Sequence, residues 1–544
     1  MKGSERSSTN TTMNTTMNRI TRNTRLAAAL VCAAAGTLAG TAHAAGEAKN
    51  VIFFLGDGMG PVTVTAARIY KGEKQLAAQP GSLVSPERAN LVMQSLPYAG
   101  RVKTFSLDGQ TTDSAPSMAA YMTGVKMRNE VISMSSDTTA VDSTGKQYIN
   151  GNSDDTTCPP TNGKAVDTLL ELAKAKGRSV GAVSTTRVGH ATPATTYAHI
   201  CNRNGYNTIA EQSVPGHANY NPKLLDGVDV LLGGGQRNYL PVSVLSSSKR
   251  TDGVNLVTAM TAKGYTYVDT GTKLKAVDTA ATGKLLGLFS SSEMAYELDR
   301  VKQPLLDQPS LSEMTEKALG VLSKNDKGFF LMVEGGRIDH ALHGTNAKRA
   351  LEDTLAFDTA IQTALDFMNK KDPGLKNTLV VVTADHDHAI AFNGYPKIGN
   401  PILGKVNSYA DGKLAKAADG NPYTTLVFGN GGRPGSISYG EANDPTATPD
   451  SIAKKINDSK VNSEDSKKPW IAPARGPVRD DQTAMDTTDD NFLQEVGINL
   501  GSPGAETHGG GDVMLFAGGA GSKIFKGTVE NIKVFNKVKE AAGL

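Results

Sequence analysis

Short apolar runs recur along the chain and alternate with longer amphipathic stretches. The runs are rich in Val, Ile, Leu and Phe and end in glycine or polar residues, which is typical of buried strands. We predict strands at residues 51–55, 179–184, 228–232, 329–333, 379–383 and 513–517. The remaining periodic stretches predict helices beginning near Pro116 and at residues 164–176, 311–322 and 347–369. This alternation indicates an α/β fold with a large, doubly wound, mostly parallel sheet flanked by helices.

Three regions give weaker patterns. Residues 61–100 have a mixed helical pattern, and residues 236–309 are polar and irregular, so we predict that the latter run over the surface of the sheet. Residues 389–504 are rich in Gly, Pro, Asn, Asp and Lys, which predicts an irregular insertion without its own core. The insertion could form a crown, an interface or an entrance, and the sequence leaves all three open.

The N-terminal residues 1–44 have the composition of a secretory signal peptide. A basic part is followed by an Ala- and Leu-rich run at 26–38 and by the small-x-small site Ala42-His43-Ala44. The run is too short for a membrane anchor. A transit peptide is the competing interpretation of these residues. Translation that starts at Met17 would give a signal peptide of ordinary length. We therefore expect a mature catalytic domain at 45–544, located in the periplasm or secreted.

Net charge and cysteine content narrow the function classes. The chain carries 57 basic and 54 acidic residues. Five basic residues and one acidic residue lie in the signal, which leaves 52 basic and 53 acidic residues and no excess that would favour nucleic acid as a partner. Cys158 and Cys201 are the cysteines outside the signal. In an exported chain they are expected to form a disulfide, with two separate buried thiols as the alternative.

Acidic and histidine side chains follow several of the predicted strands. Asp339 and His343 lie four residues apart after the strand at 329–333, so on a helix they share one face. The carboxyl ends of parallel strands meet along one edge, where carboxylates and imidazoles can complete a metal site. One such cluster alone is more often an ordinary helix start, but several in one chain favour a metal centre. The candidate ligands are Asp57, Glu334, Asp339, His343, Asp385, His386 and His508.

A candidate nucleophile precedes one of the predicted helices. Pro116 suits a first helical turn, which places Ser114 at a helix N-terminus. Free backbone N–H groups and the helix dipole favour an anion there, so Ser114 is well placed to become phosphorylated. The alternative is that Asp113 or Ser114 serves only as the N-cap.

Six motifs give the chain its resemblance to the alkaline phosphatase family. They are Gly56-Asp57-Gly58, Asp113-Ser114-Ala115, His190-Ala191-Thr192-Pro193 followed by Arg203, Glu334-Gly335 followed by Ile338-Asp339 and His343, Thr383-Ala384-Asp385-His386, and Glu506-Thr507-His508-Gly509-Gly510. They occur in the order found in that family and cover about residues 50–518. The chain thus resembles an alkaline phosphatase over nearly all of its mature length.

The resemblance implies two Zn²⁺ ions and one Mg²⁺ ion as cofactors. The residues that match the ligands of the first zinc are Asp339, His343 and His508, and those that match the second are Asp57, Asp385 and His386. Asp57 would also bridge to a magnesium ion completed by Thr192 and Glu334. Two metals close together can stabilise both the attacking and the leaving oxygen of a phosphoryl transfer.

The resemblance also implies roles for residues around the metals. Ser114 matches the nucleophile, and Arg203 matches a guanidinium that can bind two phosphate oxygens. His388 resembles a residue that orients a metal ligand, and His190 and His340 stand where some family members have Asp and Lys.

The implied activity is hydrolysis of small phosphate monoesters through a phosphoserine, with inorganic phosphate as the product. The family is often dimeric, so a homodimer is an assembly to test. Sulfatases with a serine use Ser-x-Pro-x-Arg, but Met118 stands here in place of that arginine. Diesterases of the superfamily usually use threonine and lack the equivalents of Arg203 and the third metal. A phosphodiesterase or other altered-substrate relative, and a non-enzymatic phosphate-binding protein, are the remaining alternatives.

Overall fold

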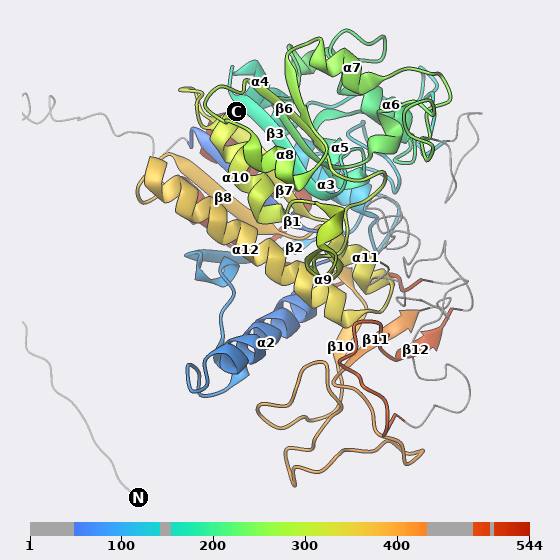
Figure 1. Cartoon of the computed structure of the whole chain (residues 1–544), viewed down its shortest axis with the longest axis vertical. Coiled ribbons are helices and arrows are strands. Elements are labelled where there is room, and N and C mark those ends of the chain that lie inside the picture. The colour runs from blue at the N-terminus through green and yellow to red at the C-terminus, as the bar shows by residue number, and fades with distance from the viewer. Residues whose placement is uncertain (1–47, 142–153, 432–481, 501–504) are drawn as a thin grey trace, which may run out of the picture. The chain divides into compact units, whose positions relative to one another are not determined.

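A mixed sheet of ten strands forms the core of the described structure (Figure 1). Every neighbouring pair is parallel except those of β14, which runs antiparallel to β2 and β8. In order across the sheet, the strands are β15 (Gly527–Glu530), β2 (Tyr98–Lys103), β14 (Val513–Gly519), β8 (Thr378–Thr383), β1 (Asn50–Gly56), β7 (Phe329–Gly335), β3 (Ser179–Arg187), β4 (Val230–Gly234), β6 (Lys284–Leu288) and β5 (Tyr265–Val268). The predicted fold class is confirmed.

The computed structural model describes residues 48–141, 154–431, 482–500 and 505–544. The predicted signal at 1–44 and the choice between Met1 and Met17 lie outside these residues. Within the described ranges, no helix is long and apolar enough to cross a membrane.

The central strands are buried along their whole length because both faces of the sheet are covered. Val51 to Leu55 of β1, the first five residues of β7 and Leu379 to Val382 of β8 are all fully buried. Continuous apolar sequence, in place of an alternating pattern, is what two covered faces require. These three strands therefore fix where their following polar residues lie.

Helices pack against both faces of the sheet. Their bounds are α2 (Pro61–Ala78), α3 (Ser114–Thr123), α4 (Leu169–Ala175), α5 (Ala191–Tyr197), α6 (Tyr206–Gln212), α7 (Leu256–Thr261), α8 (Gly271–Ala276), α9 (Glu297–Lys302), α10 (Leu311–Leu322), α11 (Arg337–His343), α12 (Ala347–Lys371) and α14 (Asn531–Ala542). The long helix α12 packs on α2, α10 and α11 and contacts β1 and β7, and Figure 1 shows α10 and α12 lying across the sheet. A second group, α3, α4, α5 and α14, packs together and contacts β3 and β7.

Local capping explains where two of the helices begin. Ser310 and Glu313 form a reciprocal capping box at the start of α10, and the predicted bounds of this helix are confirmed. The helix predicted over 164–176 is shorter than expected, because Thr168 and Glu171 form a capping box that starts α4 at Leu169. Residues before Thr168 instead pair with another segment, where Val166 N–H donates to Ser133 O at 3.0 Å.

The prediction that residues 236–309 only cross the surface of the sheet is wrong. This segment contributes β5 and β6, which extend the sheet beyond β4. In β5 an exposed and a half-buried residue lie between two buried ones, so this edge strand lacks the continuous apolar run of a central strand. The prediction also missed β2, β15 and α14.

The described parts of the insertion contain a separate small sheet. Strand β11 (Leu426–Gly431) pairs antiparallel with β10 (Ile390–Phe392) and parallel with β12 (Val496–Asn499). Two carboxylates attach the loop between β10 and β11 to the rest of the protein. Gly399 N–H donates to Glu87 at 2.8 Å, and Ile402 N–H donates to Glu73 of α2 at 2.6 Å.

A disulfide joins Cys158 to Cys201, as predicted, with 5.9 Å between the two Cα atoms. Cys201 lies two residues before Arg203 and is fully buried. The disulfide therefore holds the segment that carries this candidate phosphate-binding side chain.

Removal of this disulfide by Cys158→Ser with Cys201→Ser should lower the free energy of unfolding. The two cysteines are separated by 43 positions in the sequence, and loss of a loop of that length costs about 4 kcal/mol by the chain-entropy relation. Denaturant unfolding without reductant measures the difference. Wild-type protein unfolded with reductant should match the variant, and unchanged stability in both would contradict the prediction.

Candidate functional site

Three acidic residues lie together at the carboxyl-terminal ends of strands β1, β7 and β8. Asp57 follows β1, Glu334 lies in β7, and Asp385 comes two residues after β8. The three strands are neighbours, with β1 between the other two. All three side chains are fully buried.

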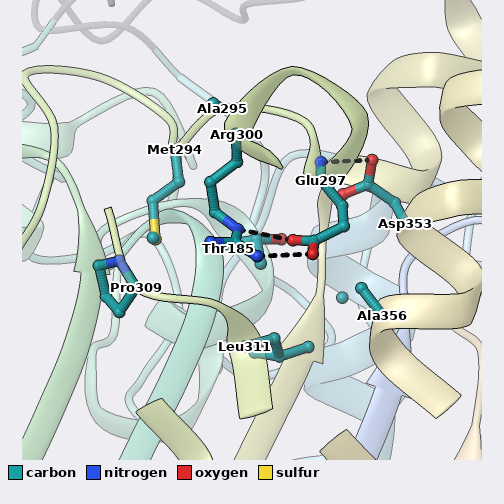
Figure 2. A pocket seen from close by; sticks show the side chains of 10 residues that line it. Thr185, Met294, Ala295, Glu297, Arg300, Pro309, Leu311, Asp353 and Ala356 are labelled. Atoms are coloured by element: carbon teal, nitrogen blue, oxygen red, sulfur yellow. Dashed lines mark hydrogen bonds and ion pairs between the residues drawn. The ribbon is translucent and has the colours of Figure 1, made fainter. Parts of the chain in front are cut away.

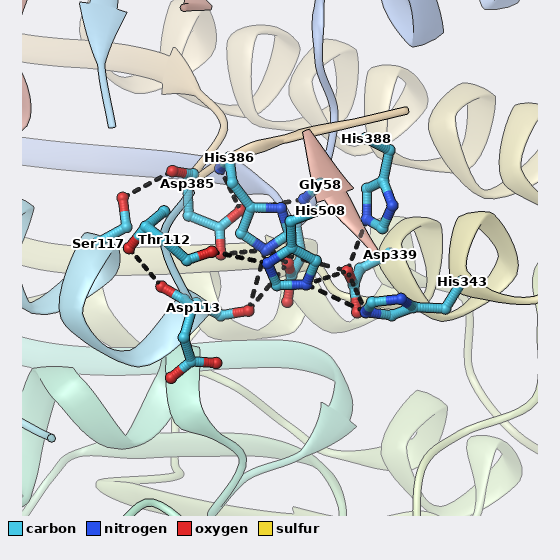
Figure 3. A network of polar contacts seen from close by, with 12 residues as sticks. Gly58, Thr112, Asp113, Ser117, Asp339, His343, Asp385, His386, His388 and His508 are labelled. Carbon is cyan, nitrogen blue, oxygen red and sulfur yellow. Dashed lines mark hydrogen bonds and ion pairs between the residues drawn. The ribbon is translucent and has the colours of Figure 1, made fainter. Parts of the chain in front are cut away.

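A group of four residues that could hold a metal ion, Asp339, His343, His388 and His508, lies next to these residues (Figure 3). His343 Nε2 is 3.3 Å and His508 Nε2 is 3.5 Å from the same oxygen, Asp339 Oδ1. Helix α11 places Asp339 and His343 on one face, as the spacing predicted. The two Nε2 atoms are only 3.1 Å apart.

Backbone carbonyls fix the orientation of the imidazoles. The Nδ1 atom of His343 lies 2.5 Å from Glu506 O, that of His508 lies 2.8 Å from Thr112 O, and that of His386 lies 3.2 Å from Asp387 O. A carbonyl only accepts, so each Nδ1 carries the proton and donates. In the neutral rings each Nε2 therefore keeps its lone pair for a metal ion, the orientation that metal-binding histidines adopt.

A second group surrounds the candidate nucleophile. His386 Nε2 lies 3.2 Å from Asp57 Oδ1 and 3.4 Å from Asp385 Oδ2. Ser114 Oγ is 3.1 Å from the same His386 Nε2 and 3.4 Å from Asp57 Oδ1. The hydroxyl of Ser114 thus lies where the second group would place a cation.

A third group contains Asp57, Glu334 and His190. One oxygen of Glu334, Oε2, accepts hydrogen bonds from Ser184 and Thr186. Thr192 lies close enough to Glu334 to lower its pKa, yet its hydroxyl makes no hydrogen bond of ordinary geometry. The hydroxyl is therefore available, with the acidic oxygens, to a hard cation.

The buried acidic groups repel one another in the absence of a cation. Burial raises the pKa of Asp57 well above its usual range, and the charges of Asp385 and Asp339 raise it further. Burial raises the pKa of Glu334 to about 7 and that of Asp385 to about 6. Burial also opposes ionisation of Asp339, but the nearby rings of His343 and His508 and the hydrogen bond from His388 hold its pKa well below the usual range.

Unpartnered oxygens show that this residue set suits metal ions. As carboxylates, Asp57 Oδ2, Asp385 Oδ2 and Glu334 Oε1 are buried and accept no hydrogen bond from the described part of the chain. Asp57 and Asp385 lie close enough to share a proton when one of them is neutral. Buried polar groups normally have partners, so several unpartnered oxygens in one place indicate that cations complete them.

His388 differs from the other histidines of the site. Its Nδ1 lies 2.5 Å from Glu506 Oε2 and its Nε2 lies 2.8 Å from Asp339 Oδ1. Burial disfavours the charged ring, but Glu506 and Asp339 raise its pKa to about 10. A ring that donates on both sides holds the carboxylate of Asp339 in place, and the role of orienting a metal ligand stays a prediction for His388. Gly58 has φ +66°, and a Cβ there would come within 2.4 Å of this ring, so the turn after Asp57 requires glycine.

Arg203 is held by groups from two other segments. Its Nη1 donates to Asp113 Oδ1, and its Nη2 donates to His190 Nε2 at 3.0 Å. Burial opposes the charge of Arg203, but Asp113 and other acidic groups raise its pKa. The ring of His190 packs on that of His340, 5.4 Å away between centroids, and Arg337 donates to His340 Nδ1 at 2.6 Å.

Helix α3 begins at Ser114, as predicted, and Asp113 takes the N-cap position. The side chain of Asp113 makes no capping hydrogen bond. It binds Arg203 instead, so the interpretation of Asp113 as only a cap is wrong. The sequence indicated this role only through its position next to Ser114.

Glu506 is a site residue that the sequence analysis did not single out. Its side chain accepts from His388 Nδ1 and, at 2.6 Å, from Ala389 N–H, while its carbonyl accepts from His343. The signal was present, because Glu506 belongs to the motif that contains His508.

A separate small pocket lies beside Gly335 and Thr185 (Figure 2). Arg300 donates to both oxygens of Glu297, at 2.8 and 2.7 Å, and Glu297 N–H donates to Asp353 Oδ2 at 3.1 Å. These polar groups satisfy one another. The contact between Glu297 and Asp353 holds the start of α9. None of the predicted site residues lines the pocket.

The fold and the site together define a class of protein, a metal-binding hydrolase with a serine among its acidic and imidazole ligands. The family model described as alkaline phosphatase matches residues 48–544. Tissue-nonspecific alkaline phosphatase from Rattus norvegicus is 35% identical over 503 residues, covering 89% of this chain and 81% of that protein. Alkaline phosphatase from Gadus morhua is 34% identical, covering 89% of each. The chain belongs to the alkaline phosphatase family.

Solved structures show the same fold. Alkaline phosphatase from Thermus thermophilus aligns with a TM-score of 0.61 and 26% identity, covering 92% of each chain. That of the Antarctic bacterium TAB5 aligns with a TM-score of 0.55 and 21% identity, covering 92% of this chain and 99% of that one.

The carboxylates and histidines of the site make stability sensitive to pH when metal is absent. The pKa of Glu334 is raised from 4.5 to about 7 and that of Asp385 from 3.8 to about 6, so the folded state binds more protons than the unfolded state. Their stabilisation is present at low pH and is lost as pH rises through 6 to 7. The raised pKa of His388, about 10, acts in the same direction from pH 6.5 upward.

We therefore expect chelated protein to unfold at a lower temperature at pH 9 than at pH 6. Readdition of Zn²⁺ and Mg²⁺ should raise the midpoint more at pH 9, because the ions then replace no protons. Differential scanning calorimetry with and without metal measures both effects. An equal effect of metal at the two pH values would contradict the prediction.

Proposed function

We propose that this protein hydrolyses phosphate monoesters through a phosphoserine formed on Ser114. The observation that supports this most is the place of Ser114, which begins α3 with its Oγ 3.1 Å from His386 Nε2 and 3.4 Å from Asp57 Oδ1. The neighbouring Asp113 holds Arg203, so a group that binds phosphate lies beside the nucleophile.

The proposed metal sites follow the three groups described above. Asp339, His343 and His508 would hold one Zn²⁺, and Asp57, Asp385 and His386 would hold the other. Mg²⁺ would bind between Asp57, Thr192 and Glu334, whose oxygens are the ligands that hard cations prefer. When bound, these ions would supply the positive charge that offsets the charge of the ester and of its departing oxygen.

The protein's own residues would perform the remaining steps. Ser114 Oγ gives its proton to solvent and forms a bond to phosphorus, while the bond between phosphorus and the alcohol oxygen breaks and the departing oxygen takes a proton from solvent. N–H groups at the start of α3 and the guanidinium of Arg203 stabilise the phosphoryl oxygens. Water then attacks phosphorus and loses a proton, the bond between phosphorus and Ser114 Oγ breaks, Ser114 Oγ regains a proton, and inorganic phosphate is released. His388, His190 and His340 orient the ligands and Arg203.

We also propose that the protein is exported to the periplasm or secreted. The disulfide between Cys158 and Cys201 supports this, because disulfides persist in oxidising compartments. The predicted signal peptide at 1–44 adds the sequence argument. A homodimer is the assembly that the family resemblance implies, and sedimentation of the mature protein would test it.

The replacement Ser114→Ala should reduce kcat for an aryl phosphate monoester by at least about 10³-fold, since no phosphoserine can form. The assay uses metal-loaded protein at alkaline pH and compares the monoester with the corresponding diester and sulfate. Dominant turnover of the diester or sulfate by wild type would favour an altered-substrate relative, and no turnover of any ester would favour a phosphate-binding protein.

The replacement Arg203→Ala should weaken binding of inorganic phosphate about 10-fold to 100-fold, the loss expected for charge-assisted hydrogen bonds. The inhibition constant of phosphate measures this change. Arg178→Ala provides a matched control, because Arg178 donates to the distant carbonyls of Ala48 and Ala542. Equal affinity in wild type and Arg203→Ala would contradict the proposed role.

A further inference from the structure

A short segment at residues 129–132 connects Asp113, the residue before the candidate nucleophile Ser114, to the segment that carries Arg203. Ile132 and Ile200 exchange backbone hydrogen bonds of 2.9 and 3.0 Å, and Arg203 N–H donates to Glu130 O at 2.8 Å. On the other side, Asp113 N–H donates to Asn129 Oδ1 at 3.0 Å. The segment therefore sets the distance between Asp113 and Arg203.

Glu130 occupies the centre of this connection. Its N–H donates to Asp113 Oδ2 at 3.1 Å, and its carbonyl accepts from Arg203. Its φ of +71° is unfavourable for a residue with a side chain. Such conformations persist where the surroundings determine them, and they concentrate at functional sites. The two backbone bonds of Glu130 are the surroundings that hold it here.

The carboxyl group of Glu130 contacts Asn204, the residue that follows Arg203. Burial raises the pKa of Glu130 to about 7, the charge of Asp113 raises it too, and Arg203 opposes the shift. Glu130 Oε2 accepts from Asn204 Nδ2 at 3.4 Å, and Asn204 Oδ1 accepts from Tyr206 of α6 at 3.2 Å. Around Arg203 itself, the other titratable neighbours are His190, Tyr206 and Asp57.

We propose that Glu130 is a positioning residue that regulates how strongly Arg203 binds phosphate. When Glu130 is neutral, Asp113 is the acidic group that competes with phosphate for the guanidinium. When Glu130 is ionised, Arg203 has a second acidic neighbour, and the oxygens of bound phosphate are repelled by it. Phosphate then dissociates more readily, which favours product release in alkaline solution. The inference rests on the proposed function, because it assigns phosphate to Arg203.

The replacement Glu130→Gln tests this role, since it keeps the size of the side chain and removes its charge. We expect the variant to bind inorganic phosphate about 3-fold to 10-fold more tightly than wild type at pH 9, the effect of one nearby, partly screened charge. At pH 6 the two proteins should agree within about twofold, because Glu130 is then largely protonated in wild type. Calorimetric titration of metal-loaded protein with phosphate measures both affinities.

Two further variants separate the charge from other causes. Glu130→Gly removes the carboxyl group and the unfavourable φ together, and it should show the same gain at pH 9 if the charge is responsible. Glu73→Gln is the matched control, because burial also raises the pKa of Glu73 to about 7. Glu73 lies on α2 twelve residues beyond Pro61, about 18 Å along the helix, and its removal should leave phosphate binding unchanged.

The outcomes distinguish this inference from the proposed function. If Glu130→Gln and Glu130→Gly bind phosphate with the same affinity as wild type at both pH values, the proposed role of Glu130 is overturned. A shift of equal size at pH 6 and pH 9 would also overturn it, because a structural change would produce that result. Calorimetry does not depend on turnover, so wild-type protein that binds phosphate but hydrolyses no monoester would count against the proposed function alone.

Discussion

Repulsion among buried carboxylates is the constraint on which the site depends. Asp57, Glu334 and Asp385 lie close together at the carboxyl-terminal ends of neighbouring strands. Because they are buried, water does not screen the repulsion between their charges. The repulsion can be relieved by protons, which raised pKa values indicate, or by cations. Because the sheet core fixes the strand ends, the acidic groups cannot move apart. Metal ions would therefore stabilise the fold as well as supply the chemistry.

Backbone carbonyls, not other side chains, set the orientation in which His343, His386 and His508 could bind a metal ion. Carbonyl oxygens of Glu506, Thr112 and Asp387 receive the Nδ1 protons of three rings, so the Nε2 atoms face the acidic groups. The carbonyls of Glu506 and Thr112 belong to loops and that of Asp387 to the short strand β9 (Asp387–His388), and each lies within two residues of a candidate site residue. A change in loop conformation would turn the ring, and the affinity for metal depends on such orientation.

The sequence predicted the central part of the fold and the acidic residues at its strand ends, because β1, β7 and β8 are continuous apolar runs followed at once by polar residues. It did not predict β5, whose polarity is mixed, or β6, a short apolar run that contains Gly287, nor the start of α4, which a capping box decides. The partners of the site were harder to predict. Contacts such as that between Asp113 and Arg203 join residues 90 positions apart, and no local pattern records them.

Because Asp113 and Ser114 are neighbours in the sequence, the position of the candidate nucleophile is linked to that of Arg203. Ser114 Oγ faces Asp57 and His386, while the preceding residue binds Arg203. A guanidinium that is buried without an acid would be costly, so Asp113 must hold it when phosphate is absent. Under the proposed function, phosphate would have to compete with Asp113 for the same N–H groups. The acids around Arg203 would then help to set the affinity for the product, and phosphate could be released without weakening the proposed metal sites.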